Sequence, residues 1–393
     1  MFEPTLSDVI AIDTEGSVIH IYNDPSGGRK DNHIATAYNC QVFSEDFFDK
    51  FGKILKAYQM KHSTMPLQKV SLVLPDHAFL TDTIDIPNIG KKAMENSLEL
   101  AISAVYKNKS ELKYRTFSMM QNKQFATFGL VGLRKDLAAK LTDICAENHI
   151  AVQNITFAAN AMTNGAFALN NKLKSSSFVL LNIRENASRL AFVNKGQTVG
   201  GYSLPFGYSI LYKSILAAED LLFDHATAEL LVLNAKEKAK AKQLTMMEEE
   251  VLEDSDQEQP AAPVFGDPED GEFETWDGKK TGRKLPKFML RDIPTDREGF
   301  VYENFRLFVK WTLELIAANA ATTNPEGVDT VYVHLPRGYE FLYDMVNAEE
   351  EENGVKFQPL LAGARFESGT PGSGDLELLG GLYVKQFNKI NNF

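Results

Sequence analysis

Cysteine is scarce in this chain of 393 residues, and long apolar runs are missing. The two cysteines, Cys40 and Cys145, lie far apart and have no metal-ligand spacing, which argues against a disulfide framework. No apolar run approaches the ~20 residues of a spanning helix, and the N-terminus lacks the pattern of a signal peptide. We therefore expect a cytoplasmic protein that contacts a membrane only indirectly, through a partner.

Basic residues are absent from the stretch 248–277, where thirteen residues are acidic, and this block accounts for the net charge of −12. The chain has no basic stripe either, which argues against nucleic-acid binding because phosphate contacts require clustered Lys and Arg. Several prolines and glycines accompany the acids, so we predict a flexible acidic insertion at about 246–295. It could attract a basic partner, although such blocks are usually only solvated.

Zinc-ligand spacing is also lacking among the seven histidines, and neither cysteine has a motif neighbour that would mark it as a nucleophile. The glycine-rich stretch 369–375 is not followed by the Lys-Ser/Thr pair of a phosphate loop, which favours a surface loop. The sequence therefore predicts no metal site and no catalytic residue.

What the sequence does contain is a repeated order of strands and turns. Short apolar runs separated by polar turns fill residues 9–43, and the same order returns at 177–206. Helical periodicity follows the first copy at 44–62, where Ser44 can cap the helix. The copies share little identity, so the repeat lies in the order of elements. This pattern predicts a pseudo-symmetric pair of α/β domains.

Strands and helices alternate between the two copies and return after the acidic insertion. Residues 69–87 predict two strands, 88–106 a helix, and 114–133 a hairpin, followed by a helix and a strand up to 157. Further predicted elements are helices at 210–245, 297–325 and 338–352, strands at 329–336 and 356–360, and the closing segment "LELLGGLYVKQF".

This order of elements resembles the actin-like ATPase superfamily, first the PilM-type proteins of type IV pilus assembly and next the FtsA-type division proteins. "LVLPDHAFLTDTIDIPNIGKKAMENSLELAI" resembles the module that replaces the usual second subdomain, and "LKYRTFSMM" and "PFGYSIL" also fall in the family's order. The resemblance implies an α/β, actin-like (ribonuclease H-like) two-domain fold. Residues 1–174 would form the first domain, with a PilM-type module at about 44–150, and residues 175–393 the second.

The resemblance also implies a nucleotide site between two glycine turns, where an acid positions hydrated magnesium. In the first turn, "DTEGS", Asp13 matches the acid, but Glu15 stands where the family has glycine. Gly16 and Ser17 follow one place late. A carboxylate in this position repels a polyphosphate unless a cation lies between them.

The other elements of that site also depart from the family's pattern. In the second turn Asn182 replaces the acid and Arg184 the glycine, so a charge is lost and a bulky side chain gained. Glu229, after Ala228, would suit the ribose, but Val232 replaces the lysine near the base. The adenosine loop keeps only Gly338, and Pro336 removes a backbone donor. We predict a degenerate nucleotide pocket and no cofactor, with ATP and magnesium as the alternative if the pocket is functional.

The function that the resemblance implies is a scaffold at the inner face of the inner membrane, in a type IV pilus or related secretion machine. It would dock a short cytoplasmic peptide of an inner-membrane PilN-type protein, with residues 70–105 forming one wall of the groove. Whether it also forms a homo-oligomer stays open. The alternative is an active actin-like ATPase that cycles or polymerises. An FtsA-like division protein is a third option, which "VKQFNKINNF" disfavours because this segment is short and polar for a membrane helix.

Overall fold

A computed structural model of the chain describes residues 7–23, 33–89, 91–106, 109–204, 207–209, 310, 312–319, 328, 330–335, 355–360, 376–384 and 392–393. By its contacts the chain divides into one unit of Met1–Tyr208 with Leu315–Phe393 and a second of Ser209–Glu314. Almost all described residues belong to the first unit. The predicted acidic insertion and the predicted helix at 210–245 lie outside the described residues, and the boundary at 174/175 stays a prediction.

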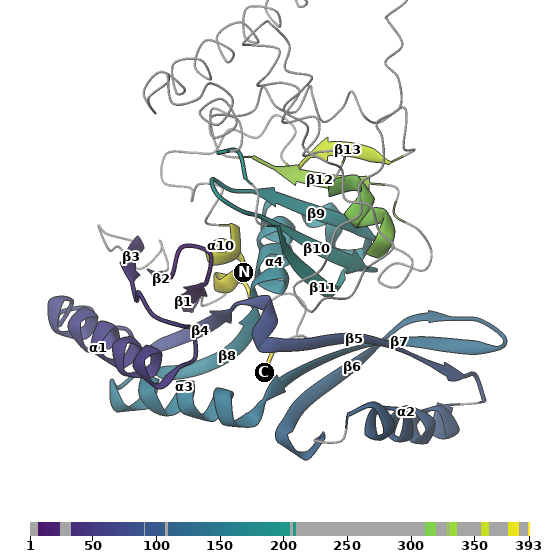
Figure 1. Cartoon of the computed structure of the whole chain (residues 1–393), viewed down its shortest axis with the longest axis horizontal. Coiled ribbons are helices and arrows are strands. Elements are labelled where there is room, and N and C mark those ends of the chain that lie inside the picture. The colour runs from purple at the N-terminus through teal and green to yellow at the C-terminus, as the bar shows by residue number, and fades with distance from the viewer. Residues whose placement is uncertain are drawn as a thin grey trace, which may run out of the picture. The chain divides into compact units, whose positions relative to one another are not determined.

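The first sheet is built from the N-terminal meander and two later strands (Figure 1). Its strands, in spatial order, are β3 (His33–Ala37), β2 (Val18–Tyr22), β1 (Asp8–Asp13), β4 (Lys69–Leu74) and β8 (Ala151–Phe157). The meander strands pair antiparallel, whereas β4 runs parallel to β1 and β8 parallel to β4. β1 and β4 are buried almost throughout, as expected for strands covered on both faces.

The second sheet repeats this arrangement. Its strands, in spatial order, are β11 (Gln197–Leu204), β10 (Ser188–Asn194), β9 (Phe178–Ile183), β12 (Thr330–His334) and β13 (Lys356–Pro359). Again the three meander strands pair antiparallel, and β12 and β13 continue the sheet in parallel. The repeat predicted from the order of elements is therefore confirmed.

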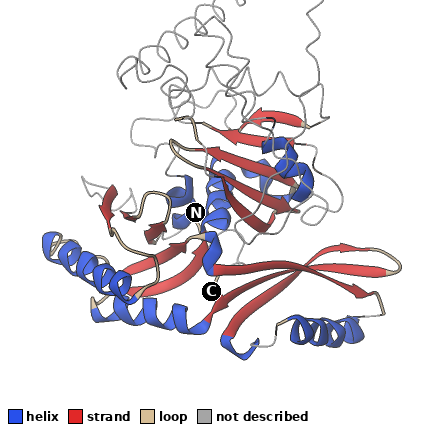
Figure 2. Ribbon diagram, viewed as in Figure 1, coloured by secondary structure: helices blue, strands red, loops and turns tan. Residues whose placement is uncertain are grey.

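A third, smaller sheet lies between these copies in the sequence (Figure 2). It pairs β5 (Phe79–Pro87), β7 (Phe125–Arg134) and β6 (Leu112–Gln121), all antiparallel, and α2 (Lys91–Val105) packs on it through Leu98 and Ile102. One-turn 3-10 helices, η2 (Asp76–Ala78) and η3 (Lys109–Glu111), precede β5 and β6. The helical spacing of Met94, Leu98, Ile102 and Val105 predicts one apolar face for α2, but Val105 at its end is 59% exposed. We call this sheet with α2 the small module.

Two helices line up with the predictions made for the first domain. α1 (Glu45–Lys61) begins after Ser44, whose hydroxyl accepts a hydrogen bond from Phe47 N, as predicted. Its predicted apolar stripe is buried, with the exception of the half-buried Ile54. α3 (Lys135–Glu147) contacts α1 and β8. Both α1 and β4 lie within the range predicted for the inserted module, yet they pack with the first sheet.

Helix α4 (Ala158–Leu169), which no periodicity predicted, packs against α10 (Leu376–Leu382). Ten of its residues are buried, so it has no polar face to produce an amphipathic pattern. Glycines allow the close approach. A Cβ on Gly380 would lie 1.6 Å from Ala161 O, and one on Gly165 would lie 2.3 Å from Leu376 O. The 3-10 helix η4 (Asn171–Ser175) leads from α4 into β9.

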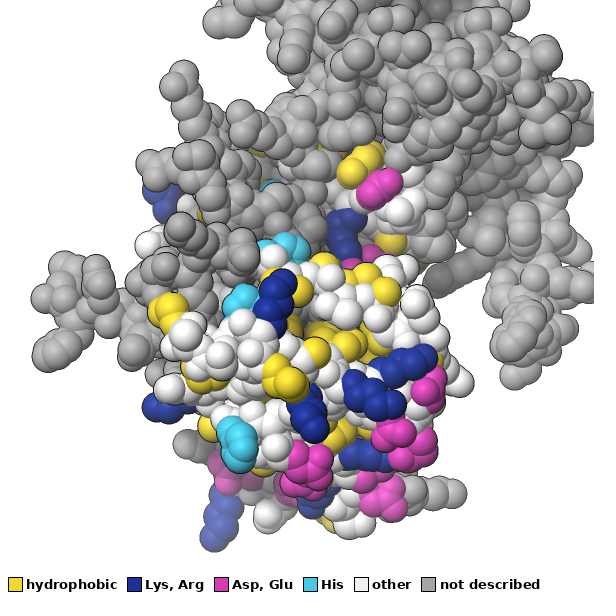
Figure 3. Space-filling view, turned by 90° about the vertical axis from the view of Figure 1, so that its left-hand side faces the viewer, with side chains coloured by type: hydrophobic (Ala, Val, Ile, Leu, Met, Phe, Trp, Pro, Cys, Tyr) yellow, Lys and Arg dark blue, Asp and Glu magenta, His cyan; other side chains and the backbone are white. Residues whose placement is uncertain are grey.

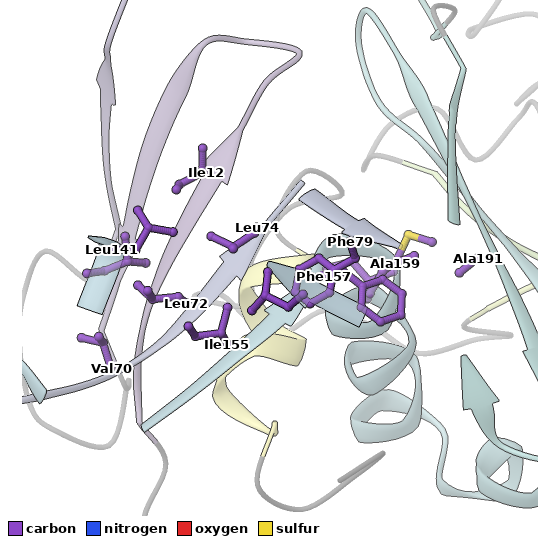
Figure 4. Close-up of a cluster of buried hydrophobic side chains, with 14 of the residues drawn as sticks. Ile12, Val70, Leu72, Leu74, Phe79, Leu141, Ile155, Phe157, Ala159 and Ala191 are labelled. Carbon is purple, nitrogen blue, oxygen red and sulfur yellow. The ribbon is translucent and has the colours of Figure 1, made fainter. Parts of the chain in front are cut away.

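The main hydrophobic core runs from the first sheet across α4 to the second sheet (Figure 4). Side chains from β1, β4, β8 and α3 meet on the first sheet, Phe79 and Phe157 lie beside α4, and Ala191 belongs to β10. Cys145 is part of this core, and burial raises the pKa of its thiol to about 12. No disulfide joins it to Cys40. Within the described residues, no helix has the length and apolar character needed to span a membrane.

Candidate functional site: two turns joined through arginine

The β1–β2 turn holds four of the predicted site residues. Asp13 ends β1 and is 7% exposed, and its Oδ1 accepts a hydrogen bond of 3.0 Å from Glu15 N. Ser17 has a positive φ of 50°, which closes the turn, and its carbonyl accepts from Tyr38 N at 2.9 Å. The turn is thereby anchored by Tyr38, the residue that follows β3.

The end of β9 and the turn that follows it hold two more predicted residues, whose side chains have different partners. Asn182 is fully buried in β9, and its Oδ1 lies 3.0 Å from His334 Nδ1 of the parallel strand β12. Arg184 follows β9, and its carbonyl accepts from Tyr208 N at 2.9 Å. Asn182 is therefore separate from the cluster that Arg184 joins. Glu229 and Gly338, like Ala228, Val232 and Pro336, lie outside the described residues.

Arg184 directly joins the two turns. Its Nη1 lies 2.8 Å from Glu15 Oε2, and its Nη2 donates to Asp13 Oδ2. All three side chains are largely buried, with exposures of 16% for Arg184, 16% for Glu15 and 7% for Asp13. Charge-assisted bonds from one planar guanidinium to two carboxylates fix geometry as well as energy. The guanidinium therefore bridges the two predicted phosphate turns.

A second arginine extends the cluster beneath Glu15. Arg189 of β10 is 3% exposed and lies 3.2 Å from Glu15 Oε1, 3.6 Å from Asp76 Oδ2 and 2.5 Å from Glu377 Oε1. Ser203 of β11 also donates to Glu15 Oε1. We call these residues the ionic cluster: Asp13, Glu15, Asp76, Arg184, Arg189 and Glu377.

The buried environment shifts the protonation of the cluster in both directions. Burial opposes ionisation of Asp13, but the contact with His20, the hydrogen bond from Arg184 and the charges of Arg184 and Arg189 hold its pKa well below the usual range. Burial is the largest influence on Asp76 and Glu377 and raises the pKa of both carboxyls. Four carboxyl groups therefore surround the two guanidinium groups of the cluster.

Three cluster residues were missed by the sequence interpretation: Asp76, Arg189 and Glu377. Each carries a charge inside an otherwise apolar segment, "LVLPD" for Asp76, "SRLAFV" for Arg189 and "LELLGG" for Glu377. A charged residue in a buried strand or helix usually has a partner, and this signal could have marked them. Asp76 also accepts from Ala159 N at 2.8 Å at the start of α4, whose N-cap residue supplies no side-chain bond.

Next to Asp13 lies a pair of histidines on adjacent strands. His20 Nε2 is 3.7 Å from Asp13 Oδ2, and His20 Nδ1 is 2.9 Å from His33 Nε2, with the rings stacked. No group of three or more His, Cys, Asp or Glu side chains in the described part of the chain is arranged to hold a metal ion. On the face of Figure 3, acidic and basic side chains lie intermixed.

Comparison with known proteins places this geometry in a known fold. No protein-family model and no curated protein matches the chain. Among solved structures it is similar to the PilM-PilN type IV pilus biogenesis complex, with 12% identity and a TM-score of 0.50 over 97% of this chain and 96% of that one. This chain has the actin-like fold. The predicted α/β, actin-like fold and the resemblance to PilM-type structures are thereby confirmed.

Two further solved structures match over most of the chain with lower TM-scores. The MamK double helical filament is 11% identical, with a TM-score of 0.41 over 97% of this chain and 99% of that one. The ethanolamine utilization protein EutJ from Carboxydothermus hydrogenoformans is 9% identical, with a TM-score of 0.40 over 97% and 90% of the two chains.

Proposed function

We propose that this protein is a scaffold of a type IV pilus or related secretion machine, positioned at the inner membrane by an inner-membrane partner of PilN type. The observation that supports it most is the likeness to the PilM-PilN complex, which extends over nearly the whole of both chains. In this proposal the actin-like fold serves as a rigid body for docking a short peptide. Chemistry on a nucleotide has no part in it.

The ionic cluster supports a degenerate nucleotide pocket. Magnesium needs oxygen ligands that are free to face it, and Asp13 is already engaged by Arg184. Glu15 would face a polyphosphate with a negative charge in a region of low dielectric. Arg184 itself is bound to two carboxylates, so its positive charge is compensated before a phosphate arrives. These residues do not fit a bound magnesium–polyphosphate.

In this proposal the small module forms one wall of the docking groove. α2 buries Leu98 and Ile102 against the sheet, but Leu100 on the same helix is 72% exposed and Val105 59%. Ile89, just before α2, is 58% exposed. An extended peptide binds by adding main-chain bonds to apolar contacts, so exposed apolar side chains on this wall suit the task.

The test is a binding titration with the cytoplasmic peptide of the PilN-type protein encoded nearest to this gene. We expect Leu100→Glu and Val105→Glu to weaken binding, because each places a charge on an apolar contact surface. Met60→Glu is the matched control, since Met60 is also 72% exposed but lies on α1, outside this wall. No binding by the folded wild-type protein would contradict the partner. Equal binding by all variants would contradict the wall.

The ATPase alternative has its own test. Calorimetry with magnesium-ATP compares the wild type with Asp13→Ala, and we expect no heat of binding from either protein. Tight binding by the wild type that is lost in Asp13→Ala would favour the ATPase, because it would require Asp13 to order magnesium despite its contact with Arg184.

A further inference from the structure

The two turns that would face a nucleotide's phosphates instead contact each other through side chains. Arg184 of the β9–β10 turn reaches Asp13 and Glu15 of the β1–β2 turn, at the ends of the equivalent hairpins in the two five-stranded sheets. The Arg184 guanidinium is a cation, whereas a nucleotide's phosphate is an anion. The group that lies between the two turns in this protein therefore has the opposite charge to a bound phosphate. Glu15 in place of glycine supplies the counter-charge.

Glu15 is fully occupied in this arrangement. Its Oε2 pairs with Arg184 at 2.8 Å, while its Oε1 receives Arg189 at 3.2 Å and the Ser203 hydroxyl. The Glu15 carboxylate therefore contacts the β9–β10 turn, strand β10 and the edge strand β11 of the second sheet. A buried carboxylate with partners on both oxygens is held in a single orientation.

Backbone hydrogen bonds hold both turns in the conformation that allows this contact. Glu15 N bonds to Asp13 Oδ1, which aligns the two acids, and Arg184 N donates to Ala187 O at 3.1 Å. Gly207 leaves room for the second turn, because a Cβ there would lie 2.1 Å from Arg184 O. Glu15 N and Arg184 N therefore have hydrogen-bond partners within the protein and need no ligand.

We infer that Arg184, with Asp13 and Glu15, is an ionic latch that takes the place of a nucleotide and fixes the two turns to one another without any ligand. The inference rests on the proposed function, which needs a fold that does not cycle. Its consequence is that the two halves keep one arrangement while a partner is bound or released. Arg189 supports the latch from below by holding Glu15 Oε1.

Hydrogen–deuterium exchange of the full chain tests the latch. If the latch exists, a substitution in one turn should change the amide exchange rate in the other turn. Arg184→Gln does not alter the sequence of the β1–β2 turn, but we expect it to speed amide exchange there roughly tenfold. The reason is that the charge-assisted bonds from Arg184 limit local opening of that turn. Glu15→Gln is expected to do the same in the β9–β10 turn. Arg134→Gln, which removes an exposed arginine paired with Asp136, is the control and should change neither turn.

Two outcomes would overturn the latch. The first is faster exchange confined to the substituted turn, and the second is no change in either turn. If Arg184→Gln fails to fold, Arg184→Lys keeps the charge without the planar fork and should give a smaller effect in the same two turns. Slower exchange of the wild type on adding magnesium-ATP would contradict the proposed function, and this result does not depend on the variants.

Discussion

Arg184 and Glu15 are 169 positions apart in the chain, and Arg184 Nη1 lies 2.8 Å from Glu15 Oε2. The contact joins two turns that the sequence presents as separate, imperfect copies of one motif. Each copy has a charged residue where the proteins that the sequence resembles have glycine, and the two charges are opposite. The structure pairs the two departures, so they compensate each other.

Glu15→Gly is expected to leave magnesium-ATP affinity unchanged, because Arg184 still engages Asp13 when Glu15 is gone. Combining it with Arg184→Gly frees Asp13 and should raise the affinity. Isothermal calorimetry measures both. Glu185→Gly removes the same charge at an exposed position of the second turn and is the matched control. A gain from Glu15→Gly alone would mean that Arg184 does not occupy the site.

Arg189→Ala is expected to cost about 3–5 kcal/mol of unfolding free energy, because it removes the cation that contacts the buried Asp76 and Glu377 and leaves Glu15 paired with Arg184 alone. Urea unfolding followed by circular dichroism gives the value. Arg134→Ala, which breaks an exposed pair with Asp136, should change stability little. If Arg189→Ala and Arg134→Ala had equally small effects on stability, the ionic cluster would be more solvated than the 3% exposure of Arg189 indicates.

Gly380→Ala should destabilise the protein by about 3 kcal/mol or more, because the added Cβ would lie 1.6 Å from the backbone oxygen of Ala161. Gly52→Ala provides the opposite case. It lies inside α1, where the nearest atom to an added Cβ is Ile144 Cγ2 at 3.5 Å, so helix propensity should raise stability by up to about 1 kcal/mol. Thermal melts of the two variants should therefore shift in opposite directions.

His334 should make stability depend on pH below neutrality. Burial lowers the pKa of its imidazole from 6.5 to about 4, so the unfolded state takes up the proton first. Its contribution is full above about pH 6.5 and is lost as the pH falls to about 4, up to about 3 kcal/mol in all. His334→Asn should remove this part of the slope in urea titrations from pH 7 to 4.

The matched control is His149→Asn. His149 is exposed, and its positive φ of 61° suits asparagine, so the variant should keep the wild-type slope. A slope that persists in His334→Asn would place the pH dependence on other groups. Asp76 and Glu377 are not the source of a loss on acidification, since a raised carboxyl pKa favours the folded state as the pH falls.

Much of the fold followed from local pattern. The alternation in residues 9–43 and its return after Ser177 gave the two meanders, and the spacing of Phe47, Phe51 and Leu55 gave α1 with its cap. α4 escaped because it is buried on all sides and has no polar face. The pairing of β9 with β12 also escaped, since more than a hundred residues separate them and periodicity carries no information on such contacts.

The sequence by itself determined that Glu15 and Arg184 stand where the family has glycine, and that their charges disagree with a phosphate. Only the tertiary structure decided what those charges do. Packing of the two halves brings the turns within contact distance, and in a buried site each charge must be paired or neutralised. Arg189, Asp76 and Glu377 join for the same reason, although nothing local in their segments names their partners.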